Sequence, residues 1–221
     1  RVAVVGANGS GKSTLVAVLA RQLDPAGGHY TVDGRDIRDL PLPDVRELFA
    51  IVDDEPHVFA TTLRENLRLA AGATSAPGDA APGDAAGGGA GPDDAAPDDA
   101  VPGDDALVKA LRRAGLGAWL EGLPDGLETR LGTGGRGVSG GERARLGLAR
   151  ALLSGRPVLL LDEPVAHLDH ATATAVLADL AASASNHTVV MVTHRPEGLE
   201  HFDTVLDLTP TGRSSRGQVG G

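Results

Sequence analysis

A glycine-rich run that ends in Lys-Ser-Thr, Gly6-Ala-Asn-Gly-Ser-Gly-Lys12-Ser13-Thr14, is the feature that most restricts how this chain can fold. Four apolar residues, Val2–Val5, precede it, as expected of a strand buried in a parallel sheet. Apolar residues at three- and four-residue intervals follow it as far as Asp24-Pro25, which predicts a helix that stops there. The sequence therefore predicts a strand, a glycine-rich turn and a helix in direct succession.

This succession is typical of a phosphate-binding loop. The backbone N–H groups from Gly9 to Thr14 and the positive end of the helix would surround the phosphates of a nucleotide. We expect Lys12 to reach the outer phosphates and Ser13 to bind Mg²⁺, with ATP and Mg²⁺ as cofactors. The expected nucleotide contacts are Gly6, Asn8, Gly9, Ser10, Gly11, Lys12, Ser13 and Thr14. A glycine-rich turn that only caps a helix is the alternative, and the strand, the lysine and the Ser-Thr pair together argue against it.

Two carboxylates, Asp162 and Glu163, directly follow the apolar run Val158–Leu161. Such a strand places them at the carboxyl edge of the sheet, where open α/β sheets bind ligands. We expect Asp162 to hold Mg²⁺ through its water shell, and Glu163 to orient or deprotonate the attacking water. A solvated acidic turn before Pro164 is the alternative. The phosphate-binding loop in the same chain favours the catalytic interpretation.

Ser139-Gly140-Gly141-Glu142 predicts the start of another helix that could bind an anion. Ser and Glu at this spacing form a capping box, so a purely structural role is one interpretation. The two glycines leave the N–H groups at the helix start open to a phosphate. Two anion sites on one chain cannot easily serve one phosphate group. We therefore expect this second site to serve the ATP of a neighbouring subunit.

His194 follows the apolar run Val189–Val192. As a lone residue it would be a strand-end histidine bonded to backbone. Together with Lys12 and Glu163, its neutral imidazole is suited to hold the γ-phosphate and to position water.

Asp169 precedes a predicted helix and has two interpretations: it is only the N-cap of that helix, or it also faces the partner subunit. His167 and His170 lie beside it and suggest a metal site. We reject that site because the sequence offers no third ligand at a known spacing.

The remaining periodicity predicts an α/β architecture. Further strands are expected at His29–Asp33, Ile51–Val52, Thr188–Val192 and Val205–Leu208, and helices at Thr62–Leu69, Asp105–Ala114, Gly141–Leu153 and His170–Ala182. Alternating strands and helices imply a mostly parallel sheet with helices on both faces. We expect one unit over residues 1–221, with a core from 1–60 and 155–210, a helical subdomain over 61–154 and a flexible tail at 211–221.

The segment 71–105 consists almost entirely of Ala, Gly, Pro and Asp, which predicts a disordered surface insertion without a function of its own. From Ala70 to Asp105 it carries eight Asp and no Lys, Arg or Glu, so most of the net charge of -10 lies in it. The rest of the chain offers no Lys/Arg stripe for electrostatic binding to nucleic acid. Nucleic acid is therefore not expected as a partner.

The chain contains no cysteine, which excludes disulfides and thiolate metal sites and suits a reducing cytosol. No apolar run approaches the roughly 20 residues needed to cross a bilayer, and no signal peptide precedes the first strand. We expect the chain to be one domain of a larger protein.

These motifs and their order resemble the nucleotide-binding domain of ABC transporters, with Walker A, Q-loop, signature, Walker B, D-loop and H-loop. The resemblance implies a P-loop NTPase core with a mostly parallel sheet flanked by helices, a small antiparallel β subdomain and a helical signature subdomain. It also implies ATP hydrolysis coupled to transmembrane transport. Two such domains would pair head to tail, so that Ser139, Gly140, Gly141, Glu142 and Asp169 approach the nucleotide of the partner.

Within this family, Phe59–Leu67 resembles the exporter pattern after the Q-loop, and Gly134–Arg143 and Met191–Arg195 resemble the CydC subfamily. That implies a heterodimeric bacterial exporter of cysteine and glutathione, needed for cytochrome bd assembly, with a CydD-like ATPase domain as partner. It also implies a transmembrane domain, expected upstream of residue 1 or on an associated chain, and a place at the cytoplasmic face of the bacterial cell membrane.

Other functions stay open from the sequence. They are an exporter of lipids, peptides or drugs, an ATPase of chromosome maintenance or repair, and a sensor that binds ATP without cutting it. A chromosome ATPase would need a long heptad insertion, whereas the insertion here is acidic and rich in Pro and Gly. Glu163 and His194 argue against the sensor, and Asp54 mildly favours it.

Two positions depart from the family pattern. Asp54 stands where the Q-loop glutamine is expected, and we keep it as a candidate contact of the nucleotide and of Mg²⁺. Its charge should weaken ATP binding unless Mg²⁺ screens it, so we expect the composite site with Asp54 to turn over more slowly than its partner site. The second departure, Val165-Ala-His-Leu-Asp169, replaces the usual Thr-containing approach to the D-loop, and its consequence does not follow from the sequence.

Overall fold

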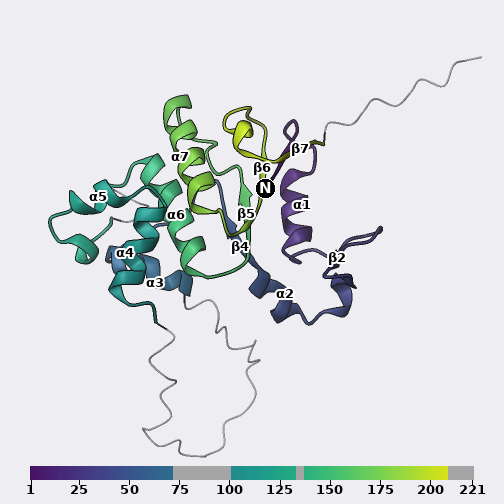
Figure 1. Ribbon diagram of the computed structural model, residues 1–221, viewed down its shortest axis with the longest axis horizontal. Coiled ribbons are helices and arrows are strands. Elements are labelled where there is room, and N and C mark those ends of the chain that lie inside the picture. The colour runs from purple at the N-terminus through teal and green to yellow at the C-terminus, as the bar shows by residue number, and fades with distance from the viewer. Residues whose placement is uncertain (72–100, 133–136, 209–221) are drawn as a thin grey trace, which may run out of the picture.

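A five-stranded, fully parallel sheet forms the centre of the molecule (Figure 1). The structure is a computed structural model and describes residues 1–71, 101–132 and 137–208. In spatial order the strands are β4 (Phe49–Val52), β5 (Val158–Asp162), β6 (Thr188–Thr193), β1 (Val2–Val5) and β7 (Thr204–Asp207). Because all five strands run in one direction, their carboxyl ends meet at one edge of the sheet.

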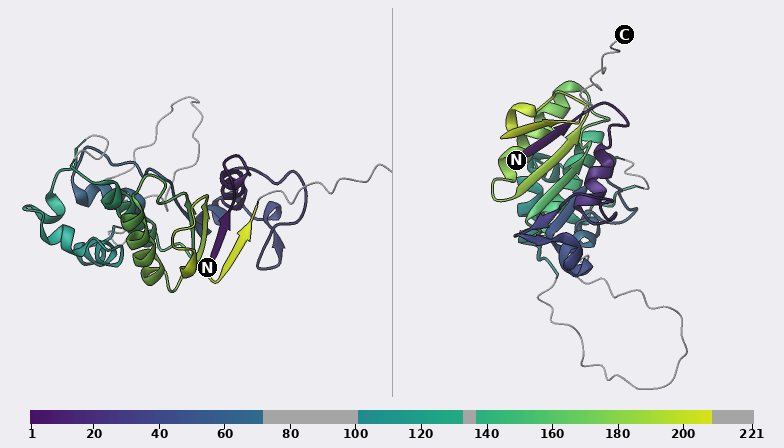
Figure 2. Two further views of the ribbon diagram at one scale, coloured as in Figure 1. Left: turned by 90° about the horizontal axis from the view of Figure 1, so that it is seen from above. Right: turned by 90° about the vertical axis from the view of Figure 1, so that its right-hand side faces the viewer.

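Helices cover both faces of this sheet (Figures 1 and 2). The helices α6 (Gly140–Leu153) and α7 (His170–Ser183) lie against one face, and α1 (Lys12–Leu19) lies against the other. Burial of both faces explains why the inner strands are continuous apolar runs and do not alternate with polar residues.

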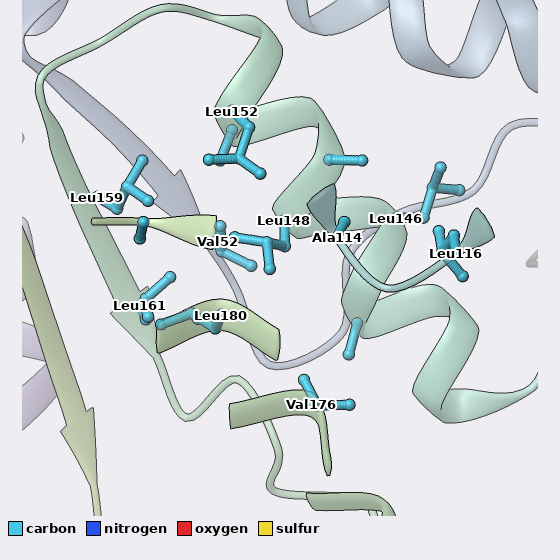
Figure 3. Packing of buried hydrophobic residues seen from close by; sticks show 14 of the residues in the cluster. Val52, Ala114, Leu116, Leu146, Leu148, Leu152, Leu159, Leu161, Val176 and Leu180 are labelled. Carbon is cyan, nitrogen blue, oxygen red and sulfur yellow. The ribbon is translucent and has the colours of Figure 1, made fainter. Parts of the chain in front are cut away.

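Successive side chains of β5 alternate between two apolar cores. Leu159 and Leu161 belong to the core under α6 and α7, whereas Leu160 belongs to the core under α1. All three leucines are fully buried. Figure 3 shows the first core, in which side chains from helices and strands interdigitate, among them Leu148, Leu152, Val176, Leu180, Val52, Leu159 and Leu161.

Three further helices lie at one end of the molecule, beyond α6 (Figure 2). They are α3 (Leu63–Ala71), α4 (Asp104–Arg113) and α5 (Gly117–Glu121), and both α3 and α4 contact α6 directly. The helix α4 buries Leu107, Ala110 and Leu111 along one side. This apolar stripe at helical spacing is what attaches α4 to the rest of the fold.

A two-stranded antiparallel sheet is formed by β2 (Thr31–Val32) and β3 (Arg35–Asp36). The turn between them consists of Asp33 and Gly34, with φ angles of 49° and 78°. An Asp-Gly pair with positive φ at both positions matches the twist of a hairpin. The predicted strand over His29–Asp33 is therefore correct only in its centre, and β3 was not predicted.

The α/β fold class is confirmed, and most predicted elements are confirmed with ends shifted by one or two residues. The first helix is an exception, because α1 already ends at Leu19 and does not continue to Asp24-Pro25. Two helices were not predicted, α2 (Leu42–Leu48) and α5. Prolines lie at the start of α2, where their missing N–H has no helical partner to lose. The predicted tail at 211–221 and most of the predicted insertion at 71–105 lie outside the described residues, although α4 already begins at Asp104.

Asn66 on α3 is a fully buried polar residue that joins three segments. Its Oδ1 accepts hydrogen bonds from the Phe59 backbone N–H at 2.9 Å and from Arg150 Nη2 at 2.7 Å. Its Nδ2 donates to the carbonyl oxygens of Phe59 at 3.0 Å and Thr62 at 2.9 Å. Burial lowers the pKa of Arg150, which also donates through Nε to the Asn66 carbonyl. The amide thus fixes α3 and α6 to the segment that follows β4.

Replacing Asn66 with Ala should destabilise the fold by about 2–4 kcal/mol, because it leaves the partly buried Phe59 N–H and one Arg150 donor without acceptors. Urea unfolding followed by circular dichroism measures this change. Asn186→Ala, an exposed position, is the matched control and should stay within about 0.5 kcal/mol of the parent. Equal stability of the two variants would contradict the structural role of Asn66.

Candidate functional site

The loop between β1 and α1 has the shape of an anion site. Gly9 and Gly11 have positive φ angles of 80° and 96°, and a Cβ at either position would meet nothing within 4 Å. Residues with side chains rarely adopt this backbone conformation, so the glycines allow the loop to turn its N–H groups inward. Ser10 Oγ is buried and has no hydrogen-bond partner in the described parts of the chain. A buried hydroxyl of this kind fits an oxygen-rich ligand such as a phosphate.

Lys12 folds back over this loop. Its Nζ donates to the carbonyl oxygens of Gly6 at 2.9 Å and Ala7 at 3.1 Å, and lies 3.5 Å from Glu163 Oε1. The lysine is only 6% exposed. A buried ammonium group needs such oxygen partners, and phosphate oxygens could replace the two carbonyls.

Ser13 and Asp162 meet as predicted for the metal site. Ser13 Oγ donates to Asp162 Oδ1 at 3.3 Å. Burial raises the pKa of the Asp162 carboxyl, the hydrogen bond from Ser13 lowers it, and the negative charge of Glu163 raises it further. A hydroxyl and a carboxylate are the hard oxygen ligands that Mg²⁺ uses when it keeps several waters and binds phosphates. These two residues therefore fit Mg²⁺.

Glu163 is held in an unusual backbone conformation, with a φ of 50°. Its N–H donates to the Val192 carbonyl at 3.0 Å. Its Oε2 accepts hydrogen bonds from Thr193 Oγ1 at 3.2 Å and from the His194 N–H at 3.3 Å. Strained residues of this kind cluster at functional sites, where the surrounding contacts hold them. We call Lys12, Glu163, Thr193 and His194 the Glu163 cluster.

His194 contributes its ring to the same carboxylate. His194 Nδ1 lies 2.9 Å from Glu163 Oε2. An ionised carboxylate only accepts hydrogen bonds, so the proton of this contact belongs to Nδ1. The expected neutral imidazole could then offer a phosphate only the lone pair of Nε2. The expected role of His194 as a neutral imidazole that holds the γ-phosphate stays a prediction.

Ser139 and Glu142 form the predicted capping box at the start of α6. Glu142 N–H donates to Ser139 Oγ at 3.2 Å, and Ser139 N–H donates to Glu142 Oε2 at 2.7 Å. The helices α6 and α1 lie on opposite faces of the sheet (Figure 1). The two candidate anion sites of the chain are therefore separate.

The glycines of this helix start have a second role that the sequence analysis missed. A Cβ at Gly141 would lie 2.7 Å from Thr172 Cγ2, and one at Gly140 would lie 3.0 Å from Leu168 Cδ2. Both positions therefore allow the start of α6 to approach the start of α7 closely. The need for glycine at these two positions follows from their contacts with Leu168 and Thr172, which are distant in the sequence. No local sequence pattern could have indicated it.

Asp169 is the N-cap of α7, which confirms the first of its two interpretations. Its Oδ1 accepts from the Thr172 N–H at 3.0 Å and its Oδ2 from Thr172 Oγ1 at 2.7 Å. These hydrogen bonds hold the pKa of the Asp169 carboxyl below its usual range.

The two departures from the family pattern meet each other in space. Asp54 Oδ2 lies 3.3 Å from His167 Nε2, although the residues are 113 positions apart. Both side chains are about half exposed or more. Asp54 also belongs to the surroundings of Asp162, since its charge contributes to the raised pKa of that carboxyl. The structure thus places Asp54 near the predicted metal ligands and in contact with the loop that follows Glu163.

His170 has a carboxylate neighbour of its own, since its Nδ1 lies 3.3 Å from Glu197 Oε1. In the described ranges, no group of three or more His, Cys, Asp or Glu side chains is arranged to hold a metal ion.

No helix in those ranges is both long and apolar enough for a membrane span.

Comparison with known proteins gives a family match over most of the chain. Residues 1–166 match the family model described as ABC transporter. The fold is similar to that of a bacterial Atm1-family ABC exporter with ATP bound, at a TM-score of 0.70 and 29% identity, over 94% of this chain and 32% of that chain.

Curated relatives differ in what they are described as transporting. The glutathione/L-cysteine transport protein CydC of Escherichia coli K12 is 38% identical over 93% of this chain and 30% of its own length. The lipid A-core flippase of Albidiferax ferrireducens is 34% identical, over 94% of this chain and 31% of its own length. Multidrug resistance protein 1 of Entamoeba histolytica is 31% identical, over 92% of this chain and 14% of its own length. The chain thus spans less than a third of each of these relatives.

Proposed function

Because the chain belongs to the ABC transporter family, as an ATPase domain of the exporter type, we propose that it powers an exporter by hydrolysing ATP between two such domains. The observation that carries the proposal is the Glu163 cluster. Glu163 lies within 3.5 Å of Lys12 through one carboxylate oxygen and 2.9 Å from His194 through the other. The Ser13–Asp162 pair lies directly beside it.

The contacts of the cluster suggest a role for each side chain. Lys12 exchanges its loop carbonyls for the outer phosphates, and Ser13 with Asp162 holds Mg²⁺. Glu163, whose carboxylate is fixed by Thr193 and His194, orients a water and takes its proton at a carboxylate oxygen. The metal ion, when bound, offsets the charge on the phosphates during transfer.

The second half of the site comes from a facing ATPase domain. The start of α6, with Ser139 and Glu142, lies on the face of the sheet opposite to α1, which supports a role toward a nucleotide other than the one on the loop of its own chain. Helix starts with bare N–H groups bind phosphates. Asp169, at the start of α7, faces the same partner in this arrangement.

The exported compound is a thiol in our proposal, cysteine or glutathione, with a CydD-like domain as the partner ATPase and a transmembrane domain on the same or an associated chain. The support is the identity of 38% to CydC, against 34% and 31% to the flippase and the multidrug protein. The ATPase would then work at the cytoplasmic face of a bacterial cell membrane, where it assists cytochrome bd assembly. Residues 61–154 would form its helical subdomain.

The substrate proposal is tested with the transporter that contains this chain in proteoliposomes. Glutathione or cysteine should raise its ATPase rate about 2-fold or more and accumulate inside, whereas lipid A or hydrophobic drugs should do neither. Stimulation by lipid or drug alone would replace the thiol proposal but leave the ATPase proposal intact.

Replacing Glu163 with Gln should reduce ATP turnover by at least about 100-fold, because a positioned general base contributes that much or more. Binding of a fluorescent ATP analogue should change by less than about 2-fold, since Lys12 and the loop are unaltered. With ATP and Mg²⁺ the variant should associate with a second ATPase domain, as measured by light scattering.

Glu200→Gln is the matched control, since Glu200 is exposed and lies outside the cluster. It should hydrolyse ATP like the parent. Retained hydrolysis in the Glu163 variant would move the general base to another residue. Failure to associate with either a second copy or the partner domain would overturn the composite site.

Replacing Asp54 with Gln should raise the ATPase rate of the paired transporter by about 3-fold. The half-exposed carboxylate repels the phosphates, but solvent screens it, so the effect stays below about 1 kcal/mol. Asp125→Asn removes the same charge at an exposed position after α5 and is the control, with no change expected. An unchanged rate in the Asp54 variant would show that this carboxylate does not slow the site.

A further inference from the structure

The segment after β6 contacts nearly the whole loop that connects β5 to α7. Thr193 and His194 hold Glu163, at the start of that connection. The residues that follow, Arg195 and Glu197, contact the rest of it. We call residues 164–169 the post-β5 loop.

Arg195 donates to the backbone of the post-β5 loop with one end of its guanidinium. Nη1 lies 2.9 Å from the Val165 carbonyl, 2.8 Å from the Leu168 carbonyl and 3.4 Å from that of Ala166. The side chain is 20% exposed. A single charged donor group therefore satisfies carbonyls along the whole loop, and such charge-assisted hydrogen bonds are stronger than neutral ones.

Glu197 holds Arg195 in this position. Its Oε1 accepts from Arg195 Nη2 at 2.9 Å and lies 3.3 Å from Nδ1 of His170, the first residue of α7. The backbone N–H of Glu197 itself and then the Arg195 guanidinium lower the pKa of this carboxyl to about 2. The carboxylate is 10% exposed and stays ionised at neutral pH. The guanidinium is thus fixed from both sides.

The post-β5 loop has another neighbour on its far side, the start of α6. Leu168 contacts Gly140, where a Cβ would lie only 3.0 Å from Leu168 Cδ2. A cavity of about 170 Å³ lies beside this contact and is lined by Pro164, His167 and Leu168 of the loop together with Asp54, Gly140 and Arg143. The loop is therefore packed on the start of α6 at Leu168 with free volume beside that contact, and the hydrogen bonds from Arg195 are among the contacts that hold it.

We propose that Arg195 is a positioning residue that makes the post-β5 loop, and the start of α6 that packs on it, follow Glu163 and His194 when nucleotide binds. The inference rests on the proposed ATPase function. Its physical basis is that His194 and Arg195 are consecutive in the chain. A shift of His194 towards a phosphate therefore also moves the Arg195 guanidinium, which donates hydrogen bonds to the post-β5 loop. Among the residues that the structure describes, the Arg195 side chain donates hydrogen bonds to the post-β5 loop and to Glu197 but not to the loop from Gly6 to Thr14.

A lysine cannot replace this arginine fully. The planar guanidinium donates to loop carbonyls with Nη1 and to Glu197 with Nη2 at the same time, whereas a single ammonium group has no fixed fork. We expect Arg195→Ala to lower kcat about 10-fold with KM for ATP changed less than about 2-fold, and Arg195→Lys to lie between that variant and the parent. A merely structural contact would not separate kcat from KM in this way.

The motion itself is measured with a spin label. The chain has no cysteine, so Ala171→Cys, at an exposed position beside Asp169 and His170, carries a single label. Addition of the non-hydrolysable analogue AMP-PNP with Mg²⁺ should change the label spectrum in the parent, change it at most half as much with Arg195→Lys, and leave it unchanged with Arg195→Ala. Arg113→Ala is the matched control, because Arg113 also donates to a backbone carbonyl, that of Ser183 at the end of α7, but away from the site.

The outcomes separate the two proposals. If the parent binds no nucleotide, the ATPase proposal fails. If Arg195→Ala hydrolyses ATP at the parental rate and shows the parental spectral change, the positioning role is wrong while the ATPase proposal stands. If Arg195→Ala does not fold, Arg195→Lys and Glu197→Gln decide the matter, since a parental kcat and spectral response in both would also overturn the inference.

Discussion

The register of three parallel strands is the constraint on which the site depends. Asp162, the last residue of β5, pairs with Val192 of β6, and Val5, the last residue of β1, pairs with Thr193. Parallel pairing in this register makes the three strands end together. The phosphate-binding loop, Glu163 and His194 are the residues that come next along each strand. Their proximity is therefore set by backbone pairing, and the side chains only refine it.

The charges at this edge are suited to a ligand that brings a cation together with an anion. Burial and the neighbouring Glu163 raise the pKa of Asp162, so its charged form is disfavoured until a positive partner arrives. Lys12 offsets part of the negative charge through Glu163, at 3.5 Å. A triphosphate alone would draw Lys12 away and leave the carboxylates facing phosphate oxygens. A nucleotide that brings its own divalent cation avoids this repulsion, which is consistent with Mg·ATP as the ligand.

The sequence predicted those features whose causes are local. The loop from Gly6 to Thr14, the apolar run before Asp162 and the capping box of Ser139 each lie within a few residues, and the structure has each of them where it was expected. The amino-acid sequence alone could not predict contacts between segments that are far apart along the chain. The Asp54–His167 pair spans 113 positions, and Arg195 reaches back 27 to 30 positions to the post-β5 loop. No periodicity encodes such pairs, so a departure from the family at residues 165–169 had no physical account until its partner Asp54 was known.

The same long-range contacts connect the nucleotide site of this chain to the start of α6, which in our proposal completes the site of a partner domain. In the proposed dimer, Glu163 and His194 face the nucleotide that is bound to the phosphate-binding loop of the same chain. The start of α6 faces the nucleotide of the partner domain. Between them lies the post-β5 loop, bonded to Arg195 on one side and packed through Leu168 on Gly140 on the other. If this loop moves together with Arg195, as we propose, a displacement at one half-site becomes a displacement at the other. The two glycines of α6 allow this packing, because a Cβ at Gly140 or Gly141 would lie within 3.0 Å of Leu168 or Thr172.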